Sequence, residues 1–302
     1  MEEPLQSRRI AVTGAGGFVG LIAVEALARQ GASVQAVVGP PGAPARIPRG
    51  AASVAQAEIC DAAALAKLFD GAEIVVHLAG TPSVAASFED PARTMRVHGE
   101  GTAAVLQACR AAAVASLVYV SSAEVYGQPR RLPVSEEHPL EPRSPYGAAK
   151  IAAEKLIEAW APAFGMRAVV LRPFSIFGPG ASADSVMERI IAQARSGDRI
   201  LLHDLAPVRD YCFVGDLAAA IGRSCAAEVN GVFNVGTGRG ASVAEVAALV
   251  LGALNRNCPV LEDGKKRPGE IHRLIADTRR ARDVLGWQAA VSLEDGLRRM
   301  LS

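Results

Sequence analysis

Short apolar runs alternate with longer alanine-rich segments through the first half of the chain. The apolar runs are rich in valine and isoleucine, as buried strands are, and they lie at residues 8–14, 33–39, 73–80, 116–122 and 167–173. Helical patterns lie between them, at residues 19–31, 63–71, 101–114 and 147–165. Strands that are apolar throughout and alternate with helices predict a parallel sheet that is covered on both faces.

After Pro173 the alternation becomes less regular. A helical pattern covers residues 185–197, short strands are indicated around residues 199–204, 209–214 and 232–236, and two more helical patterns follow. We therefore predict an α/β fold with a Rossmann-type, doubly wound parallel sheet in residues 1–173 and a smaller C-terminal lobe in residues 174–302. The strand near 232–236 is the segment that we expect to return to the first domain.

The segments that follow the predicted strands contain glycine, serine and other small or polar residues. They read TGAGGFVG, AGTPS, SSAEVYG and RPFSIFGPG in chain order. Doubly wound sheets bind their ligands beyond the carboxyl ends of the strands. We therefore expect the chemistry of this protein to lie on these four segments.

Charge and composition exclude several classes of function. The chain has 302 residues, half of them apolar, with 32 basic against 31 acidic side chains. A near-neutral chain of mixed charge lacks the basic surface of a nucleic-acid binder. Its start is acidic and polar, and no apolar stretch approaches the roughly 18 residues of a membrane-spanning helix. We expect a cytoplasmic protein that binds neither nucleic acid nor a membrane.

The cysteines and histidines are dispersed along the chain. The five cysteines form no CxxC pair, and the five histidines show no metal-ligand spacing. This pattern is typical of unpaired thiols in a reducing compartment and predicts that the protein uses no metal.

The first glycine-rich segment predicts a nucleotide site. Gly14, Gly17 and Gly20 follow a predicted strand and begin a predicted helix, with the spacing GxxGxxG. Glycine permits a tight turn and lets backbone N–H groups approach a pyrophosphate at the helix N-terminus. A tight turn alone would explain the glycines, but their place between the first strand and first helix favours a dinucleotide.

The choice between NAD and NADP is left open by the second predicted strand. A carboxylate normally grips the adenosine ribose at its end, where this chain has Val38 and Gly39. Arg46 is either a solvated loop residue or a partner for a 2′-phosphate. Glu58 and Ile59 are expected to meet the edge and face of the adenine.

Tyr146 and Lys150 form the candidate catalytic pair. They are four residues apart in a predicted helix and therefore lie on one face of it. An ammonium beside a phenol is expected to lower the phenol pKa from about 10 towards neutrality, so that it can exchange a proton with a substrate hydroxyl. Ser121 and Ser122 end a predicted strand, where a hydroxyl can bind the substrate oxygen.

Together these motifs resemble the extended short-chain dehydrogenase/reductases, specifically the NAD-dependent nucleotide-sugar epimerase/dehydratase family. The similarity runs from about Arg9 to Trp287. It is carried by TGAGGFVG, VVHLAG, VSSAEVYG, SPYGAAKIAAEKL, LRPFSIFGPG, RDYCFVGDLA, VFNVGTG and RPGEIHRLIADTRRARDVLGW. The resemblance implies a first domain that binds the dinucleotide, a second lobe that binds a nucleoside diphosphate sugar, and a homodimer.

The resemblance also implies roles for individual residues. Tyr146 would be the catalytic base, Lys150 would lower its pKa and hold the nicotinamide ribose, and Ser122 would bind the sugar hydroxyl under oxidation. Arg209 and Arg267 would clamp the diphosphate, for which guanidinium groups are well suited. The remaining cofactor contacts would come from Gly14, Gly17, Phe18, Val19, Gly20, Glu58, Ile59, Leu78, Ala79 and Gly80.

Besides Val38, three positions depart from the usual family pattern. His98 replaces an asparagine, and Ser175 replaces another asparagine that commonly contacts the sugar nucleotide. Ala123 stands where dehydratases carry an acid, next to a retained Glu124. Glu124 is either a catalytic carboxyl or a residue that only supports the neighbouring loop.

These features favour an NAD-dependent epimerase of a nucleoside diphosphate sugar that acts at C4 through a 4-keto sugar. An NADPH-dependent 4-keto reductase is the first alternative, because Val38 replaces the ribose-binding acid. A dehydratase or decarboxylase comes next, since one carboxyl does not complete the pair suited to elimination. A non-catalytic nucleotide sensor would not need Tyr146, Lys150 and Ser122 together.

Overall fold

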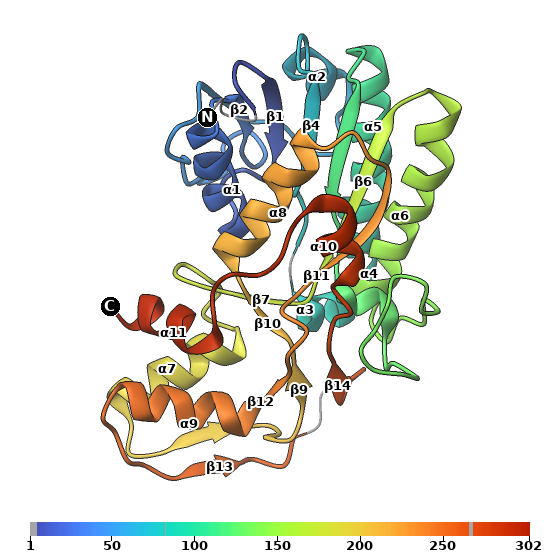
Figure 1. Ribbon diagram of the computed structural model, residues 1–302. Helices are drawn as coiled ribbons and strands as arrows, with labels where there is room; N and C mark the ends of the chain where they lie inside the picture. The colour runs from blue at the N-terminus through green and yellow to red at the C-terminus, as the bar shows by residue number, and fades with distance from the viewer. Residues whose placement is uncertain (1–4, 82, 266–267) are drawn as a thin grey trace.

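A seven-stranded parallel sheet forms the centre of the molecule (Figure 1). The computed structural model describes residues 5–81, 83–265 and 268–302. In the order β11-β6-β5-β4-β1-β2-β3, the strands are β11 (Gly231–Val235), β6 (Arg167–Pro173), β5 (Ser116–Val120), β4 (Ile74–His77), β1 (Arg9–Thr13), β2 (Ser33–Val37) and β3 (Ser53–Ala55). The sheet is doubly wound, as predicted.

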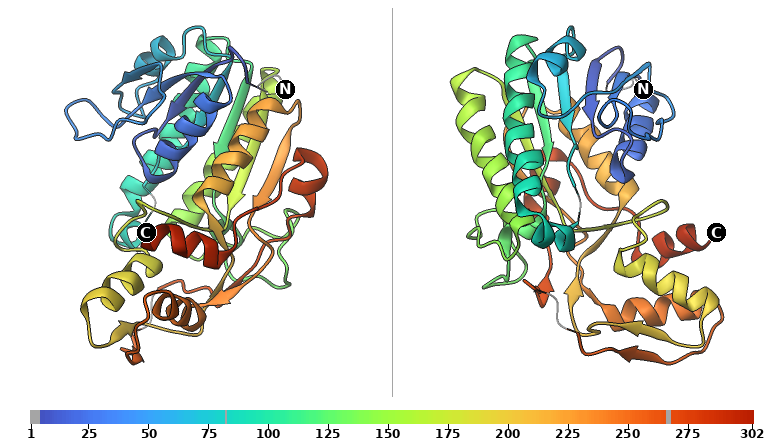
Figure 2. Two further views of the ribbon diagram at one scale, coloured as in Figure 1. Left: turned by 60° about the vertical axis from the view of Figure 1, so that its left-hand side comes forward. Right: turned by 180° about the vertical axis from the view of Figure 1, so that it is seen from behind.

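Helices cover both faces of this sheet (Figures 1 and 2). One face packs against α1 (Phe18–Arg29), α8 (Val214–Ala226) and α10 (Arg279–Leu285). The other packs against α2 (Ala62–Leu68), α5 (Gly101–Ala111) and α6 (Pro145–Ala163). Successive side chains of a strand point to opposite faces, so Ile10 and Val12 contact the first layer and Ala11 the second.

Burial of these strands supplies much of the stability of the domain. All four residues of β4 and all five of β5 are buried, which explains why their sequences show no alternation of apolar and polar residues. Each fully buried valine or leucine side chain contributes about 1.5–3 kcal/mol relative to an exposed one.

A second, smaller group of elements lies beyond one end of the sheet, in the lower part of Figure 1. Its core is built from α7 (Val186–Ser196), α9 (Val243–Ala253), α11 (Leu293–Leu301), β8 (Ile200–Leu202), β10 (Tyr211–Phe213) and β13 (Val260–Glu262). The short strands of this part of the chain form three small sheets. β8 pairs with β13, β7 (Ser175–Phe177) pairs with β10, and β9 (Val208–Arg209) pairs with both β12 (Ala241–Ser242) and β14 (Arg273–Leu274).

The chain beyond Pro173 contributes to both groups of elements. β11 pairs in parallel with β6, so the strand near 232–236 does return to the sheet. The helices α8 and α10 also pack on the sheet. The division at residue 173 stays a prediction of domain organisation, and the second lobe is built only from parts of residues 174–302.

Short helices that the sequence pattern did not predict connect β4 to α5. They are α3 (Val84–Glu89), α4 (Pro91–Met95) and a π-helical turn, η1 (Arg96–Glu100), which runs directly into α5. Single π-helical turns are rare and occur often at functional sites. None of the helices in the described part of the chain is both long and apolar enough to cross a membrane.

Candidate active site

The N-terminus of α6 carries Tyr146 and Lys150. Ser144 is the N-cap residue, and its side chain accepts a hydrogen bond of 3.1 Å from the Gly147 N–H. Pro145 occupies the first turn, where its missing N–H costs nothing. The Ser144 cap and Pro145 determine where α6 begins. The side chains of Tyr146 and Lys150 therefore both face the carboxyl end of β5.

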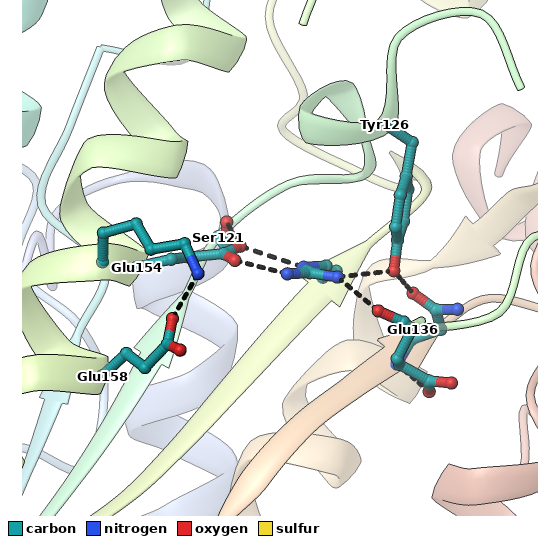
Figure 3. Close-up of polar contacts among 8 residues, drawn as sticks. Ser121, Tyr126, Glu136, Glu154 and Glu158 are labelled. Atoms are coloured by element: carbon teal, nitrogen blue, oxygen red, sulfur yellow. Dashed lines mark hydrogen bonds and ion pairs between the residues drawn. The ribbon is translucent and has the colours of Figure 1, made fainter. Parts of the chain in front are cut away.

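Three successive turns of α6 lie against residues 120–122, which are the last residue of β5 and the two residues that follow it. The Tyr146 phenol lies near the Ser122 side chain, which acts to lower the phenol pKa. Lys150 Nζ donates to the carbonyl oxygen of Val120 at 2.8 Å. Ser121 donates to the Glu154 carboxylate, one turn further along the helix, as Figure 3 shows. The structure therefore brings Tyr146, Lys150 and Ser122 together, as the sequence predicted.

The predicted fall in the pKa of Tyr146 is not found, and that expectation is wrong for this structure. Burial raises the pKa of the Tyr146 phenol to about 12, although the nearby Ser122 side chain opposes the rise. Burial also lowers the pKa of Lys150 to about 7, against the opposing charge of Glu154. Because Lys150 Nζ lies 5.8 Å from the Tyr146 ring centroid and its own charge is disfavoured, it cannot offset the burial of the phenol.

His98 is a further residue of the site, which the sequence marked only as a departure from the family pattern. Its ring lies edge-on to Tyr146, with 5.3 Å between centroids and 83° between planes. Its Nε2 lies 3.2 Å from the Thr81 carbonyl oxygen, whereas its buried Nδ1 finds no hydrogen-bond partner in the described part of the chain. Burial, with a smaller contribution from Lys150, lowers the pKa of His98 to about 3, so the ring is neutral.

The glycine-rich turn and the segment after β4 form one close-packed surface. Gly14 has a φ of +68°, and a Cβ there would lie 2.6 Å from the Ala79 nitrogen. Thr13 joins the segments, because its hydroxyl lies 2.7 Å from His77 Nδ1 and accepts a bond of 3.3 Å from the Ala79 N–H. The two segments therefore pack backbone against backbone, and Gly14 leaves no room for a side chain between them.

The N-terminus of α1 is open to an anion. Its N-cap is Gly17, so no side chain caps the first-turn N–H groups, and Phe18 and Val19 begin the helix. Gly20 cannot carry a side chain, since its Cβ would lie 2.2 Å from the Gly14 carbonyl oxygen. The residues present therefore fit the diphosphate of a dinucleotide.

Val38 stands at the position where a ribose-binding acid is expected from the sequence. That side chain is buried in the core, 1% exposed. Arg46 Nε donates to the Gly16 carbonyl oxygen at 3.2 Å, which places its guanidinium against the glycine-rich turn. Beyond β3, Glu58 is exposed and Ile59 is partly buried against α5.

The opposite side of the site carries Glu124 and Arg209. Glu124 lies in the 3₁₀ turn η2 (Ala123–Tyr126), and its N–H donates to Ser122 Oγ at 3.2 Å. Burial raises the pKa of Glu124, with Arg209 opposing and Glu270 adding to the rise. Arg209 Nη2 donates to Glu270 Oε1 at 2.9 Å. Glu270 was missed, although it belongs to the RPGE motif, because nothing in the spacing pairs it with a residue 61 positions away.

Of the other predicted sugar-nucleotide contacts, Ser175 lies near this group and Arg267 lies outside the described residues. The N–H of Ser175 donates to the Asp210 carbonyl oxygen at 2.9 Å, directly after Arg209. Among residues 5–81, 83–265 and 268–302, no three His, Cys, Asp or Glu side chains cluster as a metal site would require.

Comparison with known proteins places this site in a family. The profile of the NAD dependent epimerase/dehydratase family matches residues 10–236. UDP-glucose 4-epimerase of Mycolicibacterium smegmatis is 32% identical over 301 residues, which cover 96% of each chain. GDP-6-deoxy-D-mannose reductase of Pseudomonas aeruginosa is 33% identical over 241 residues, which cover 76% of this chain and 79% of the relative.

A solved structure agrees over nearly the whole length. MoeE5 in complex with UDP-glucuronic acid and NAD superimposes with a TM-score of 0.89 at 30% identity, covering 97% of both chains. The glycine-rich turn, the Tyr146–Lys150 helix and the matching relatives lead to one conclusion: the chain belongs to the NAD-dependent epimerase/dehydratase family, within the extended short-chain dehydrogenase/reductases.

Proposed function

We propose that this protein is an NAD-dependent epimerase that inverts C4 of a nucleoside diphosphate sugar through a transient 4-keto intermediate. The observation that carries the proposal is the contact between the end of β5 and α6, where Ser122, Tyr146 and Lys150 meet. The similarity to a UDP-glucose 4-epimerase over 96% of both chains agrees with it.

Each side chain has a defined part in this chemistry. Tyr146 would take the proton of the C4 hydroxyl, and Ser122 would hold that oxygen in place. Bound NAD supplies the hydride acceptor and, when oxidised, a positive ring charge that favours the ionised phenol. Lys150 would add a second positive charge and hold the phenol and a ribose hydroxyl in register.

The cofactor would be held by the glycine-rich turn and its neighbours. The proposed contacts are Gly14, Gly17, Phe18, Val19, Gly20, Glu58, Ile59, Leu78, Ala79 and Gly80. They combine an open helix N-terminus with a bare backbone surface, which suits a pyrophosphate.

Substrate binding would depend on Arg209. Its guanidinium is now paired with Glu270, so the diphosphate has to share or replace that carboxylate. Arg267 would complete the clamp, and Ser175 would contact the nucleotide sugar. Epimerisation needs the diphosphate held firmly while the sugar ring remains free to turn over between hydride transfers.

A reductase that uses NADPH is the second candidate. It is favoured by Val38, which offers no carboxylate to ribose hydroxyls, and by Arg46, which lies against the glycine-rich turn. The 33% identity to a GDP-6-deoxy-D-mannose reductase is consistent with it. A dehydratase or decarboxylase ranks lower, because Ala123 removes the acid that dehydratases carry next to Glu124.

One experiment separates the candidates. The purified protein is denatured, the released nucleotide is identified by mass, and a panel of nucleoside diphosphate sugars is offered without added cofactor. Retained NAD and formation of a C4 stereoisomer support the epimerase. Consumption of added NADPH supports the reductase. A protein that releases no nucleotide and turns over no sugar would contradict both candidates.

We also propose a homodimer formed through α5 and α6. A shallow, largely apolar groove runs between the end of α4, η1, α5 and α6, lined by Met95, Gly99, Glu100, Ala103, Ala152, Lys155 and Leu156. Met95 and Leu156 are 44% and 38% exposed and lie in the same groove, so they form part of one apolar surface of the kind that partner proteins bind. The highly charged substrate and cofactor do not cross membranes unaided, which favours the predicted cytoplasmic location.

A further inference from the structure

A buried ion pair lies directly behind the candidate active site. Arg172 on β6 and Glu154 on α6 have side chains that are each 5% exposed. Arg172 donates twice to the carboxylate, from Nε at 3.0 Å and from Nη2 at 2.5 Å. The geometry is the bidentate fork that makes such pairs strong and directional.

This pair is joined to several elements of the sheet layer, as Figure 3 shows for Tyr126 and Glu136. Arg172 Nη1 donates to the Tyr126 hydroxyl at 2.9 Å and to the Glu136 carbonyl oxygen at 3.2 Å. The Tyr126 hydroxyl in turn donates to Asn234 Oδ1 on β11 at 2.7 Å. Arg172 is therefore fixed by partners on three sides.

Glu154 connects the fixed Arg172 side chain to the catalytic residues. Its carboxylate accepts from Ser121, whose own N–H is tied to the Leu171 carbonyl oxygen on β6 at 2.7 Å. Ser121 immediately precedes Ser122, and Glu154 follows Lys150 by one helical turn. The Glu154 carboxylate thus contacts Ser121, the neighbour of Ser122. It also lies on the same face of α6 as Lys150.

Stability alone does not account for this arrangement. Burying two charges is costly, and well-packed apolar residues often replace such pairs without loss of stability. The pair also has a specific electrostatic neighbour, because Glu154 is the charged residue that favours the ammonium form of buried Lys150. The other ionisable groups that interact with Lys150 are uncharged: His77 from β4, His98 from η1, Tyr119 from β5 and Tyr146 from α6.

We infer that Glu154, locked by Arg172, is a positioning residue of the active site. It holds Ser121, and through it Ser122, against α6, and it keeps a compensating negative charge beside Lys150. The inference rests on the proposed function, because it assigns Glu154 a part in the same reaction.

Glu154→Gln tests this directly, with Glu158→Gln as its matched control. Glu158 lies on the same helix but is exposed and paired only with Lys155 in the described structure. The titration of Lys150 is followed by NMR in protein labelled with ¹³C at lysine Cε. The chain has five lysines, and the Lys150 signal is assigned by its loss in Lys150→Arg.

In Glu154→Gln the titration midpoint of Lys150 should fall by about one pH unit or more, because a nearby negative charge has been removed. The kcat should fall about tenfold or more while KM changes less than about threefold, since the reacting groups rather than the diphosphate contacts are disturbed. Glu158→Gln should leave both quantities unchanged.

A second variant covers the case in which Glu154→Gln folds poorly. Glu154→Met with Arg172→Met removes both charges and should restore much of the thermal stability, but it should keep the low kcat and low Lys150 midpoint. An unchanged Lys150 midpoint in the folded variants, or a kcat within about twofold of wild type, would overturn the inference. If the wild type turned over no sugar nucleotide, the proposed function would fail, while the titration would still test the link between Glu154 and Lys150.

Discussion

Burial sets the charge of the ionisable side chains around the end of β5. Tyr146 and His98 are both held in their neutral forms, and Lys150 changes charge near neutral pH. Residue spacing identified Tyr146 and Lys150, because an i,i+4 pair shares a helix face. It could not give the direction of the Tyr146 pKa shift, which depends on how deeply the packed fold buries the phenol.

His98 should influence turnover through its ring contact with Tyr146. His98→Gln retains a donor for the Thr81 carbonyl but removes the ring, so kcat should fall about tenfold as the phenol becomes less well oriented. His98→Phe retains the ring and should lose less. Steady-state kinetics on the two variants tests this, and equal losses in both would show that the edge-on contact is unimportant.

Acid should destabilise the protein through its buried histidines. The folded pKa values of His77 and His98 are lowered to about 3, so the unfolded chain binds more protons between pH 6.5 and 3 and stability falls as the pH falls through that window. At pH 5 the loss should be on the order of 1–2 kcal/mol per histidine.

Guanidinium unfolding at pH 7.5 and 5 measures this loss. His98→Gln should show a smaller loss than wild type between the two pH values, whereas His272→Gln, at an exposed position, should not. An identical pH dependence in wild type and His98→Gln would mean that His98 is not held neutral by the fold.

At the scale of elements, local patterns predicted the strands and long helices well. The strands β1, β2, β4, β5 and β6 and the helix α5 fall inside the expected segments, and α1 and α6 match theirs but begin one and two residues earlier. What the pattern did not reveal was where later segments pack: α8 and α10 cover the sheet because apolar side chains more than 200 residues apart in sequence, such as Val12 and Leu217, share one core. The pairing of Glu154 with Arg172, and of Arg209 with Glu270, likewise depends on tertiary structure.

The N-cap of α6 gives a test of how strongly this element controls the site. Ser144→Ala removes the bond to the Gly147 N–H and should destabilise the protein by about 1 kcal/mol. Because the capped turn carries Tyr146, kcat should fall as well. Ser292→Ala is the matched control, since Ser292 caps α11 through the Asp295 N–H at 3.0 Å, and it should cost similar stability with unchanged kcat. A normal kcat in Ser144→Ala would argue against control by this cap.

At the scale of the whole molecule, we propose that the sheet binds the cofactor and that the smaller group of elements binds the substrate. The predicted family, the fold class and the epimerase function agree with the comparisons. They could be predicted because the motifs directly follow the strands in the sequence, and a doubly wound sheet binds its ligands at these strand ends. The individual site roles, the choice between NAD and NADP and the sugar remain proposals.

The proposed dimer predicts a defined response to a charge in the α5–α6 groove. Leu156→Glu, at a 38% exposed position, should shift the protein from dimer to monomer in sedimentation equilibrium, because burial of an unpaired carboxylate is costly. Val284→Glu, on α10 at the opposite face of the sheet and 48% exposed, should have no effect. A monomeric wild type, or a dimer insensitive to Leu156→Glu, would place the interface elsewhere or remove it.

The most direct measurement of the central claim is the kcat of Tyr146→Phe on the sugar nucleotide that the wild type epimerises, compared with that of Tyr211→Phe. The Tyr211 hydroxyl is also buried but has no hydrogen-bond partner in the described structure, so it makes a matched control. Loss of proton exchange should reduce kcat about 10²–10⁴-fold in Tyr146→Phe and leave Tyr211→Phe near wild type. A Tyr146→Phe enzyme that turns over at the wild-type rate would contradict the account.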